Sequence, residues 1–122
     1  MTTILIVDDE YLIADILGFA LEDEGYMTVT ASNGKKGLDV LTRERPELVI
    51  TDFMMPVMDG LEFAKAIRAR EECKNLPILL MSGAQGALGR EHPELFKAVF
   101  DKPFQIAQII DMVKQLFPPD KH

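Results

Sequence analysis

The chain has 122 residues, of which 48% are hydrophobic, with 20 acidic and 13 basic side chains and a net charge of -7. These values predict one compact domain over residues 1–122 and exclude a disordered chain, while the acidic balance disfavours nucleic acid as a direct partner, because phosphate backbones attract clustered Lys and Arg. The single cysteine, Cys73, excludes an internal disulfide and favours the reducing cytoplasm, and we expect neither a signal peptide nor a membrane span.

In the first half of the chain, short apolar runs alternate with segments of helical periodicity. The run at residues 4–7 predicts a buried strand, and a helix over about residues 11–24 follows it. Alternating apolar and Thr side chains over residues 27–31 are typical of a strand with one exposed face, and a second helix is expected from residue 34 to about residue 43. A third strand covers residues 48–51. The first helix is inferred from apolar side chains at helical spacing, namely Ile13, Ile16, Leu17, Ala20 and Leu21.

The second half of the chain continues this alternation. A loop at residues 53–60 leads into a third helix, and a fourth strand follows at residues 78–81. A fifth strand is expected at residues 98–100, and a last helix over residues 106–116. The fourth helix should be short or irregular, because each interior glycine costs a helix about 1 kcal/mol relative to alanine. The glycines in this segment are Gly83, Gly86 and Gly89.

This order of elements predicts a parallel five-stranded sheet with helices on both faces, since parallel strands need crossover connections and these are right-handed. The first, third and fourth strands are richest in Ile, Leu and Val and are therefore expected at the centre of the sheet. The half-polar second strand and the short fifth strand are expected at its edges. The strand order 2-1-3-4-5 satisfies both conditions, so we predict a doubly wound α/β domain.

Polar side chains follow four of the predicted strands at the points where the strands end. Asp8 and Asp9 follow the first strand, Asp52 follows the third, Ser82 the fourth and Lys102 the fifth. Because the carboxyl ends of parallel strands meet at one edge of the sheet, these groups are expected to share one site. Three carboxylates in one pocket repel each other, and Mg²⁺, which prefers oxygen ligands, relieves that repulsion.

The same set of groups suits phosphoryl transfer. A carboxylate such as that of Asp52 can accept a phosphoryl group as an acyl phosphate. The reaction needs mainly positioning and charge neutralisation, for which Ser82 and Lys102 offer a hydrogen bond and a positive charge. In isolation, Asp8 and Asp9 would be interpreted as caps of the following helix. Their joint occurrence with the other three residues favours a phospho-acceptor site.

Four motifs together give the chain a resemblance to the receiver domains of response regulators in bacterial two-component signalling. They are Asp-Asp at residues 8–9, Met-Pro-Val-Met-Asp-Gly at residues 55–60 after Asp52, Ser-Gly-Ala at residues 82–84, and Lys-Pro-Phe at residues 102–104. The resemblance covers essentially the whole chain. It implies a flavodoxin-like fold with five helices.

The resemblance also implies a phospho-acceptor switch and not a conventional enzyme. Asp52 would receive the phosphoryl group from a phosphohistidine on a sensor histidine kinase or a phosphotransfer protein. Mg²⁺ would be held by the side chains of Asp8, Asp9 and Asp52 and by the backbone carbonyl of Met54. The resulting conformational change would alter binding to another protein.

Three further properties follow from the resemblance. Ser82 and Lys102 would contact the phosphoryl group, and the Lys102–Pro103 peptide bond would be cis. The fourth helix, fifth strand and fifth helix would form the output face, for a downstream protein or for a dimer.

Many receivers carry Tyr or Phe three residues before Lys102, where the present chain has Val99. Because a strand has a period of two, Phe100 should lie on the opposite face and not substitute for that ring.

Three other interpretations stay open. The chain can be the receiver segment of a larger transcription regulator or hybrid kinase. A cofactor binder with the same fold would need a Gly-, Ser- or Thr-rich phosphate loop after a strand, whereas the first loop here is Asp-Asp-Glu. A magnesium-dependent phosphohydrolase would share the chemistry, but such enzymes usually place the nucleophile after the first strand, with a second Asp two residues later.

Overall fold

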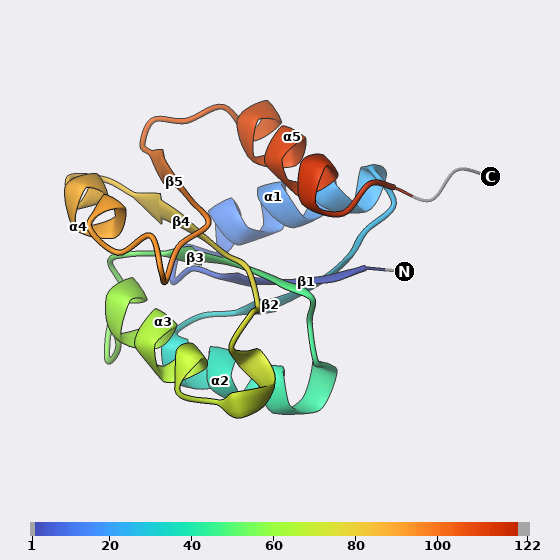
Figure 1. The fold of residues 1–122 in the computed structure, drawn as a ribbon. Helices are drawn as coiled ribbons and strands as arrows, with labels where there is room; N and C mark the ends of the chain where they lie inside the picture. Colours follow the sequence, from blue (N-terminus) through green and yellow to red (C-terminus); the bar gives the residue numbers. More distant parts are fainter. Residues whose placement is uncertain (1, 120–122) are drawn as a thin grey trace.

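Five parallel strands form the central layer of the protein, which we describe from a computed structural model over residues 2–119 (Figure 1). The strands are β1 (Thr3–Val7), β2 (Met27–Ala31), β3 (Leu48–Asp52), β4 (Ile78–Ser82) and β5 (Ala98–Asp101). Their order in the sheet is β2-β1-β3-β4-β5, which confirms the predicted doubly wound topology. The three most apolar strands lie at the centre, as their composition indicated.

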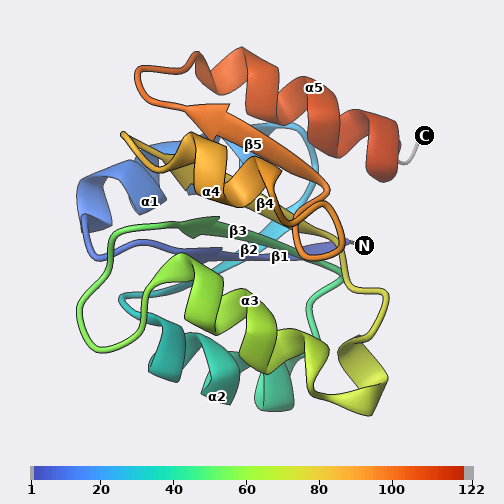
Figure 2. The ribbon, with the colours of Figure 1, turned by 60° about the vertical axis from the view of Figure 1, so that its left-hand side comes forward.

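Helices cover both faces of this sheet. Those in the described residues are α1 (Tyr11–Asp23), α2 (Gly34–Glu44), α3 (Gly60–Arg68), α4 (Gly86–Arg90) and α5 (Ile106–Leu116), and a 3₁₀-helix, η1 (Glu71–Cys73), links α3 to β4. Figures 1 and 2 show α1 and α5 together on one side of the sheet and α2 and α3 together on the other. None of the helices in this part of the chain has the length and apolar content needed to cross a bilayer.

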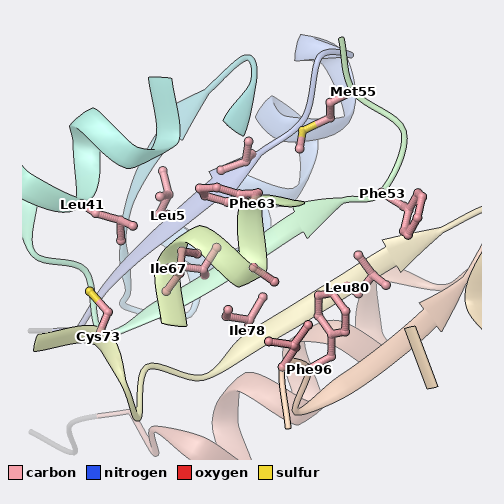
Figure 3. Packing of buried hydrophobic residues seen from close by; sticks show 14 of the residues in the cluster. Leu5, Leu41, Phe53, Met55, Phe63, Ile67, Cys73, Ile78, Leu80 and Phe96 are labelled. Carbon is pink, nitrogen blue, oxygen red and sulfur yellow. The ribbon is translucent and has the colours of Figure 1, made fainter. Parts of the chain in front are cut away.

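The sheet divides the hydrophobic core into two clusters. One lies between the sheet and the pair α2 and α3, where Phe63 and Ile67 pack with Leu5, Ile78 and Leu80 (Figure 3). The other lies between the sheet and the pair α1 and α5. Burial of each large apolar side chain contributes about 1.5–3 kcal/mol, so the two clusters hold β1, β3 and β4 firmly on both faces. The core thereby fixes the strand ends that the polar residues follow.

The buried face of α1 confirms the predicted apolar face only in part, because Leu17 and Leu21 are buried but Ile16 is not. Ile16, which belongs to the predicted apolar face, is 53% exposed. The residues that α1 buries are Ala14, Leu17, Gly18 and Leu21. A Cβ at Gly18 would lie 3.4 Å from Thr28 Oγ1, which is an ordinary contact distance, so this face of the helix lies against β2. Because α1 carries apolar side chains on several sides, periodicity alone did not select the face that packs inward.

The fourth helix is short, as the glycine content predicted, and covers only the five residues of α4. Its glycines also have a packing role, since a Cβ at Gly89 would lie 2.5 Å from Leu80 Cδ2 and 3.1 Å from Val99 Cγ2. Val99 therefore faces α4 and the cluster of α2 and α3, whereas Phe100 packs against the cluster of α1 and α5. The prediction that these two neighbours lie on opposite faces is confirmed.

Candidate functional site

A set of three carboxylates lies at the carboxyl edge of β1 and β3. Val7 is paired with Thr51 in the sheet, so the residues that follow them, Asp8 and Asp52, lie side by side. One oxygen atom from each of Asp8, Asp9 and Asp52 lies within 4.8 Å of the other two. The structure therefore brings together the three acids that the sequence placed at separate strand ends.

Asp8 has one side-chain oxygen that is bonded and one that is free. Its Oδ1 accepts a hydrogen bond from the Glu10 N–H at 2.9 Å, whereas its buried Oδ2 has no hydrogen-bond partner within residues 2–119. Burial, with added repulsion from Asp52 and Asp9, raises the pKa of Asp8 from 3.8 to about 6. A buried unpartnered oxygen beside two further carboxylates suits Mg²⁺, which takes oxygen ligands. The residues present thus fit the ion that the resemblance implies.

Asp52 and Lys102 form an ion pair inside the site. Lys102 Nζ lies 3.1 Å from Asp52 Oδ1, and the Asp52 side chain is only 5% exposed. Burial raises the pKa of Asp52, although the hydrogen bond from Lys102 acts in the opposite direction. Burial lowers the pKa of Lys102, but its hydrogen bond and charge attraction with Asp52 outweigh that effect, so the pKa of Lys102 is raised. Lys102 therefore keeps its positive charge beside the Asp52 carboxylate at neutral pH.

The loop after Asp52 is fixed at its far end by the start of α3. The Asp59 side chain accepts from the Glu62 N–H at 2.8 Å, and the Glu62 side chain accepts from the Asp59 N–H at 3.0 Å, which forms a capping box. The Gly60 N–H donates to the Phe53 carbonyl at 2.7 Å. A Cβ at Gly60 would lie 2.6 Å from the Asp52 carbonyl oxygen, so only glycine lets the helix begin directly against this residue.

Val57 occupies a strained turn in the same loop. Its φ is 74°, in the left-handed region that a β-branched residue rarely adopts. The Met58 N–H donates to the Pro56 carbonyl at 2.8 Å, which closes a γ-turn around Val57. The Val57 residue is 81% exposed, so little packing compensates for the strain.

We therefore expect Val57→Gly to raise the free energy of unfolding by about 1 kcal/mol, because glycine relieves the backbone strain and loses only part of that gain to chain entropy. Urea denaturation measures this change. Val57→Ala is the control, since alanine keeps the unfavourable φ and removes only exposed methyl groups. Equal midpoints for Val57→Gly and Val57→Ala would show that the turn stores no strain.

Ser82 and Asp101 lie opposite each other at the carboxyl ends of β4 and β5. Ser82 is buried, and its Oγ donates to Asp101 Oδ1 over 3.5 Å. The Lys102 N–H donates to the Ser82 carbonyl at 2.7 Å, which joins the two strand ends. Asp101 was missed as a site residue, although the predicted strand order already places β5 beside β4 and the residue before Lys102 beside Ser82.

Two other predicted residues lie at the rim of the site. The Lys102–Pro103 peptide bond is cis, the isomer that the resemblance implies. Met54 lies in the loop that follows Asp52, with 60% of its surface exposed. Its role as a carbonyl ligand stays a prediction.

An apolar surface borders the site on the side of α1. Its exposed large side chains on α1 are Tyr11, Leu12, Ile16 and Phe19. A groove runs between α1 and the segment after β5, and its lining includes Ile16, Lys102, Pro103 and Phe104. Because Lys102 belongs both to this groove and to the ion pair with Asp52, the groove reaches the acidic cluster, and Ile16 connects it to the exposed apolar side chains of α1.

Comparison with protein families matches residues 4–114 to the response regulator receiver domain. Sporulation initiation phosphotransferase F of Bacillus subtilis (strain 168) is 42% identical over 118 residues, which cover 94% of this chain and 93% of that protein. The match therefore extends over almost the full length of both proteins.

Solved structures give the same result. The chemotaxis protein CheY4 of Vibrio cholerae is 29% identical, with a TM-score of 0.86 and coverage of 96% of this chain and 99% of that chain. The receiver domain of a sensor histidine kinase from Pseudomonas aeruginosa PAO1, solved with a magnesium ion coordinated in its active site cleft, is 23% identical with a TM-score of 0.83, and covers 93% of this chain and 95% of that chain. At this identity the second comparison shows a shared fold.

Proposed function

The chain belongs to the response regulator receiver domain family, and on this basis we propose that Asp52 is the residue that accepts the phosphoryl group. Receiver domains are phospho-acceptor switches that interact with histidine kinases or phosphotransfer proteins and bind Mg²⁺ at an acidic pocket. One observation carries the assignment to Asp52. Its buried carboxylate belongs both to the acidic cluster and to the ion pair with Lys102.

In the proposed reaction, a carboxylate oxygen of Asp52 attacks the phosphorus of a phosphohistidine, the P–N bond breaks, and the imidazole leaves with the bonding electron pair. An acyl phosphate remains on Asp52. Lys102 stabilises the negative charge of the phosphoryl oxygens, and the Ser82 hydroxyl donates a hydrogen bond to one of them. Attack of water on the acyl phosphate uses the same groups, so we propose that the chain assists both its phosphorylation and its dephosphorylation.

Asp8, Asp9 and Asp52 are the side chains that we propose as ligands of Mg²⁺, with the Met54 carbonyl as a further ligand. The free buried Oδ2 of Asp8 supports this assignment, because a buried carboxylate oxygen without a hydrogen-bond donor is available to a cation. When bound, the ion neutralises charge on the transferring phosphoryl group. The arrangement of the carboxylates at one edge supplies the ligand atoms from two neighbouring strands.

We also propose that residues 1–122 act as one receiver domain. The support is the single sheet, whose strands lie between residues 3 and 101, together with helices on both faces. A role as the receiver segment of a larger regulator or hybrid kinase is the alternative, and the length of the natural reading frame decides between them. In either case the face of α4, β5 and α5 is the proposed output surface for a downstream protein or a second copy.

The test of the proposed function is incubation with acetyl phosphate and Mg²⁺, followed by intact mass measurement. We expect the gain of one phosphoryl group, and no gain when a chelator removes Mg²⁺. Repeated release of phosphate from a generic phosphomonoester, without a labelled intermediate on Asp52, would instead support the phosphohydrolase alternative.

The donor protein is proposed to dock on the apolar surface of α1. This surface borders the site, and a receiver must place a protein-bound phosphohistidine within reach of Asp52. Acetyl phosphate is small and needs no such surface. The two donors therefore separate docking from chemistry.

We expect Ile16→Asp to slow phosphoryl transfer from a histidine kinase by about tenfold or more, because a charge replaces an apolar contact at the docking surface. Any autophosphorylated kinase that labels the wild type serves as donor. Labelling by acetyl phosphate should stay unchanged. Leu88→Asp is the matched control, since Leu88 is also a partly exposed apolar residue but lies on α4. Equal loss with both donors would mean that the substitution distorts the site itself.

A further inference from the structure

A chain of polar contacts leads from Ser82 to α4. Ser82 Oγ donates to Asp101 Oδ1 over 3.5 Å, and Asp101 Oδ2 pairs with Arg90 Nη2 at 2.5 Å. Ser82 and Asp101 are register partners in adjacent parallel strands, so their side chains lie on the same face of the sheet. Arg90 is the last residue of α4. Asp101 thus connects the hydroxyl in the site to the helix that packs over β5.

The Asp101 carboxylate also lies directly against the start of α4. A Cβ at Gly86 would lie 2.0 Å from Asp101 Oδ1 and 2.7 Å from Arg90 Nη1, so glycine leaves the space that this carboxylate occupies. Asp101 therefore contacts α4 at both of its ends, through the backbone at Gly86 and the side chain of Arg90. A change in the position of the Asp101 side chain therefore alters the contacts of the first and the last residue of α4.

The Ser82 hydroxyl has one proton to donate. In the described structure it donates that proton to Asp101, which as a carboxylate only accepts. A phosphoryl oxygen on Asp52 is likewise only an acceptor. Ser82 therefore cannot donate to Asp101 and to a phosphoryl group at the same time, and the two contacts are mutually exclusive.

We propose that Asp101 is a positioning residue of the switch. In the unphosphorylated protein it holds the Ser82 hydroxyl away from Asp52. When Ser82 turns to the phosphoryl group, Asp101 loses its donor, and its contacts with Gly86 and Arg90 pass the change to α4. This inference rests on the proposed function, because it takes Asp52 as the acceptor and Ser82 as a phosphoryl contact.

The rate of phosphorylation by acetyl phosphate with Mg²⁺ tests the first half of the proposal. Arg90→Gln loosens Asp101, and Asp101→Ala removes the acceptor for Ser82. We expect each to speed phosphorylation by about threefold to fivefold, the equilibrium factor of one partly exposed ion pair or one hydrogen bond. Glu71→Gln, which breaks the exposed pair between Lys74 and Glu71, is the control and should leave the rate unchanged.

The choice of Arg90→Gln separates positioning from simple charge effects. Arg90 is positively charged and attracts an anionic donor, so its loss slows the reaction if only charge matters. Release of the Ser82 hydroxyl speeds the reaction instead. Asp101→Asn supplies a second distinction, because its amide oxygen still accepts from Ser82 while the negative charge is gone. Positioning predicts a smaller acceleration for Asp101→Asn than for Asp101→Ala, and a charge effect predicts equal acceleration.

Hydrogen exchange tests the second half of the proposal. The amides of Leu88 and Gly89 in α4 are bonded to the Gln85 carbonyl, and their exchange reports the opening of this helix. Beryllofluoride with Mg²⁺, which imitates the phosphoryl group, should change their exchange in the wild type. In Arg90→Gln the resting protein should already show most of that change, and beryllofluoride should add less than about a third of the wild-type effect.

The outcomes distinguish this inference from the proposed function. A wild type that gains no phosphoryl group from acetyl phosphate overturns both. A wild type that is phosphorylated normally, with Arg90→Gln and Asp101→Ala within twofold of it in both rate and α4 exchange, overturns only the role of Asp101.

Discussion

Asp52→Asn should abolish the gain of a phosphoryl group from acetyl phosphate and Mg²⁺. An amide oxygen is a far weaker nucleophile than a carboxylate oxygen, and the asparagine side chain has nearly the same shape, so chemistry is lost while packing is kept. The fold should persist, because the substitution removes one of three mutually repelling acids at the edge of the sheet. We expect labelling at least a thousandfold below the wild-type rate, which corresponds to about 4 kcal/mol in the barrier.

Asp39→Asn is the matched control for this experiment. Asp39 is exposed on α2, and its replacement should leave the mass gain intact. The resistance of the bound group to acid and its loss in hydroxylamine would identify an acyl phosphate in the wild type. If Asp52→Asn still gained one phosphoryl group, the acceptor would be another side chain, and Asp8 and Asp9 would be the next to replace.

Asp8 should make the metal-free protein less stable as pH rises. The pKa of Asp8 is about 6 in the folded protein, against 3.8 as its ordinary value, so the folded state holds this proton more tightly than the unfolded chain does. The free energy of unfolding therefore falls as pH rises through the range from about 4 to 6, and the loss stays constant above it. At neutral pH this loss amounts to about 3 kcal/mol, two pKa units at 1.36 kcal/mol each. Asp52, whose pKa burial also raises, adds to the same trend.

Asp8→Asn removes this titration and should stabilise the metal-free protein. The gain over the wild type is expected to grow from about 1 kcal/mol at pH 4.5 to about 3 kcal/mol at pH 7.5. A ligand at about a thousand times its dissociation constant adds about 4.1 kcal/mol to a protein that binds it. Because this exceeds the difference of about 3 kcal/mol, Mg²⁺ at that concentration should reverse the order at pH 7.5. Asp8→Asn, which lacks one of the proposed ligands, should gain far less.

Urea denaturation with and without Mg²⁺, at pH 4.5 and pH 7.5, measures these differences. Asp39→Asn again serves as the control, because an exposed acid on α2 has neither the buried environment nor the neighbours of Asp8. A metal-free Asp8→Asn protein that is no more stable than the wild type at pH 7.5 would contradict the buried, repelled state of this carboxyl group.

The strand order and the acidic cluster could be predicted from the sequence because both depend on properties of whole strands. The runs that became β1, β3 and β4 are apolar on both faces, which only the centre of a parallel sheet allows. Once the order of the parallel strands is known, the residues that follow the strands must lie at the same edge of the sheet. Asp8 and Asp52 needed no further information to be placed side by side.

The inward face of α1 was predicted only in part, and the contacts of Asp101 could not be predicted in the same way. In α1 the apolar spacing correctly included Leu17 and Leu21, which are buried, but it also included Ile16, which is exposed, because apolar side chains occur on several sides of the helix. The contact of Asp101 with Arg90 depends on how closely α4 lies over β5, which Gly86 and Gly89 permit. Hydrophobic periodicity carries no information about such clearances between backbones.

Every residue of β4 is buried, from Ile78 to Ser82, and the strand is hydrogen-bonded to a neighbour on each side. A sliding movement of β4 would break its backbone hydrogen bonds to β3 and to β5, and it would also disrupt both hydrophobic clusters. Ser82, as its last residue, is left with rotation about its own side-chain bond and with the loop beyond it. The sheet consequently serves as a stationary frame, and a protein that senses the phosphorylated form has to recognise the periphery of the molecule.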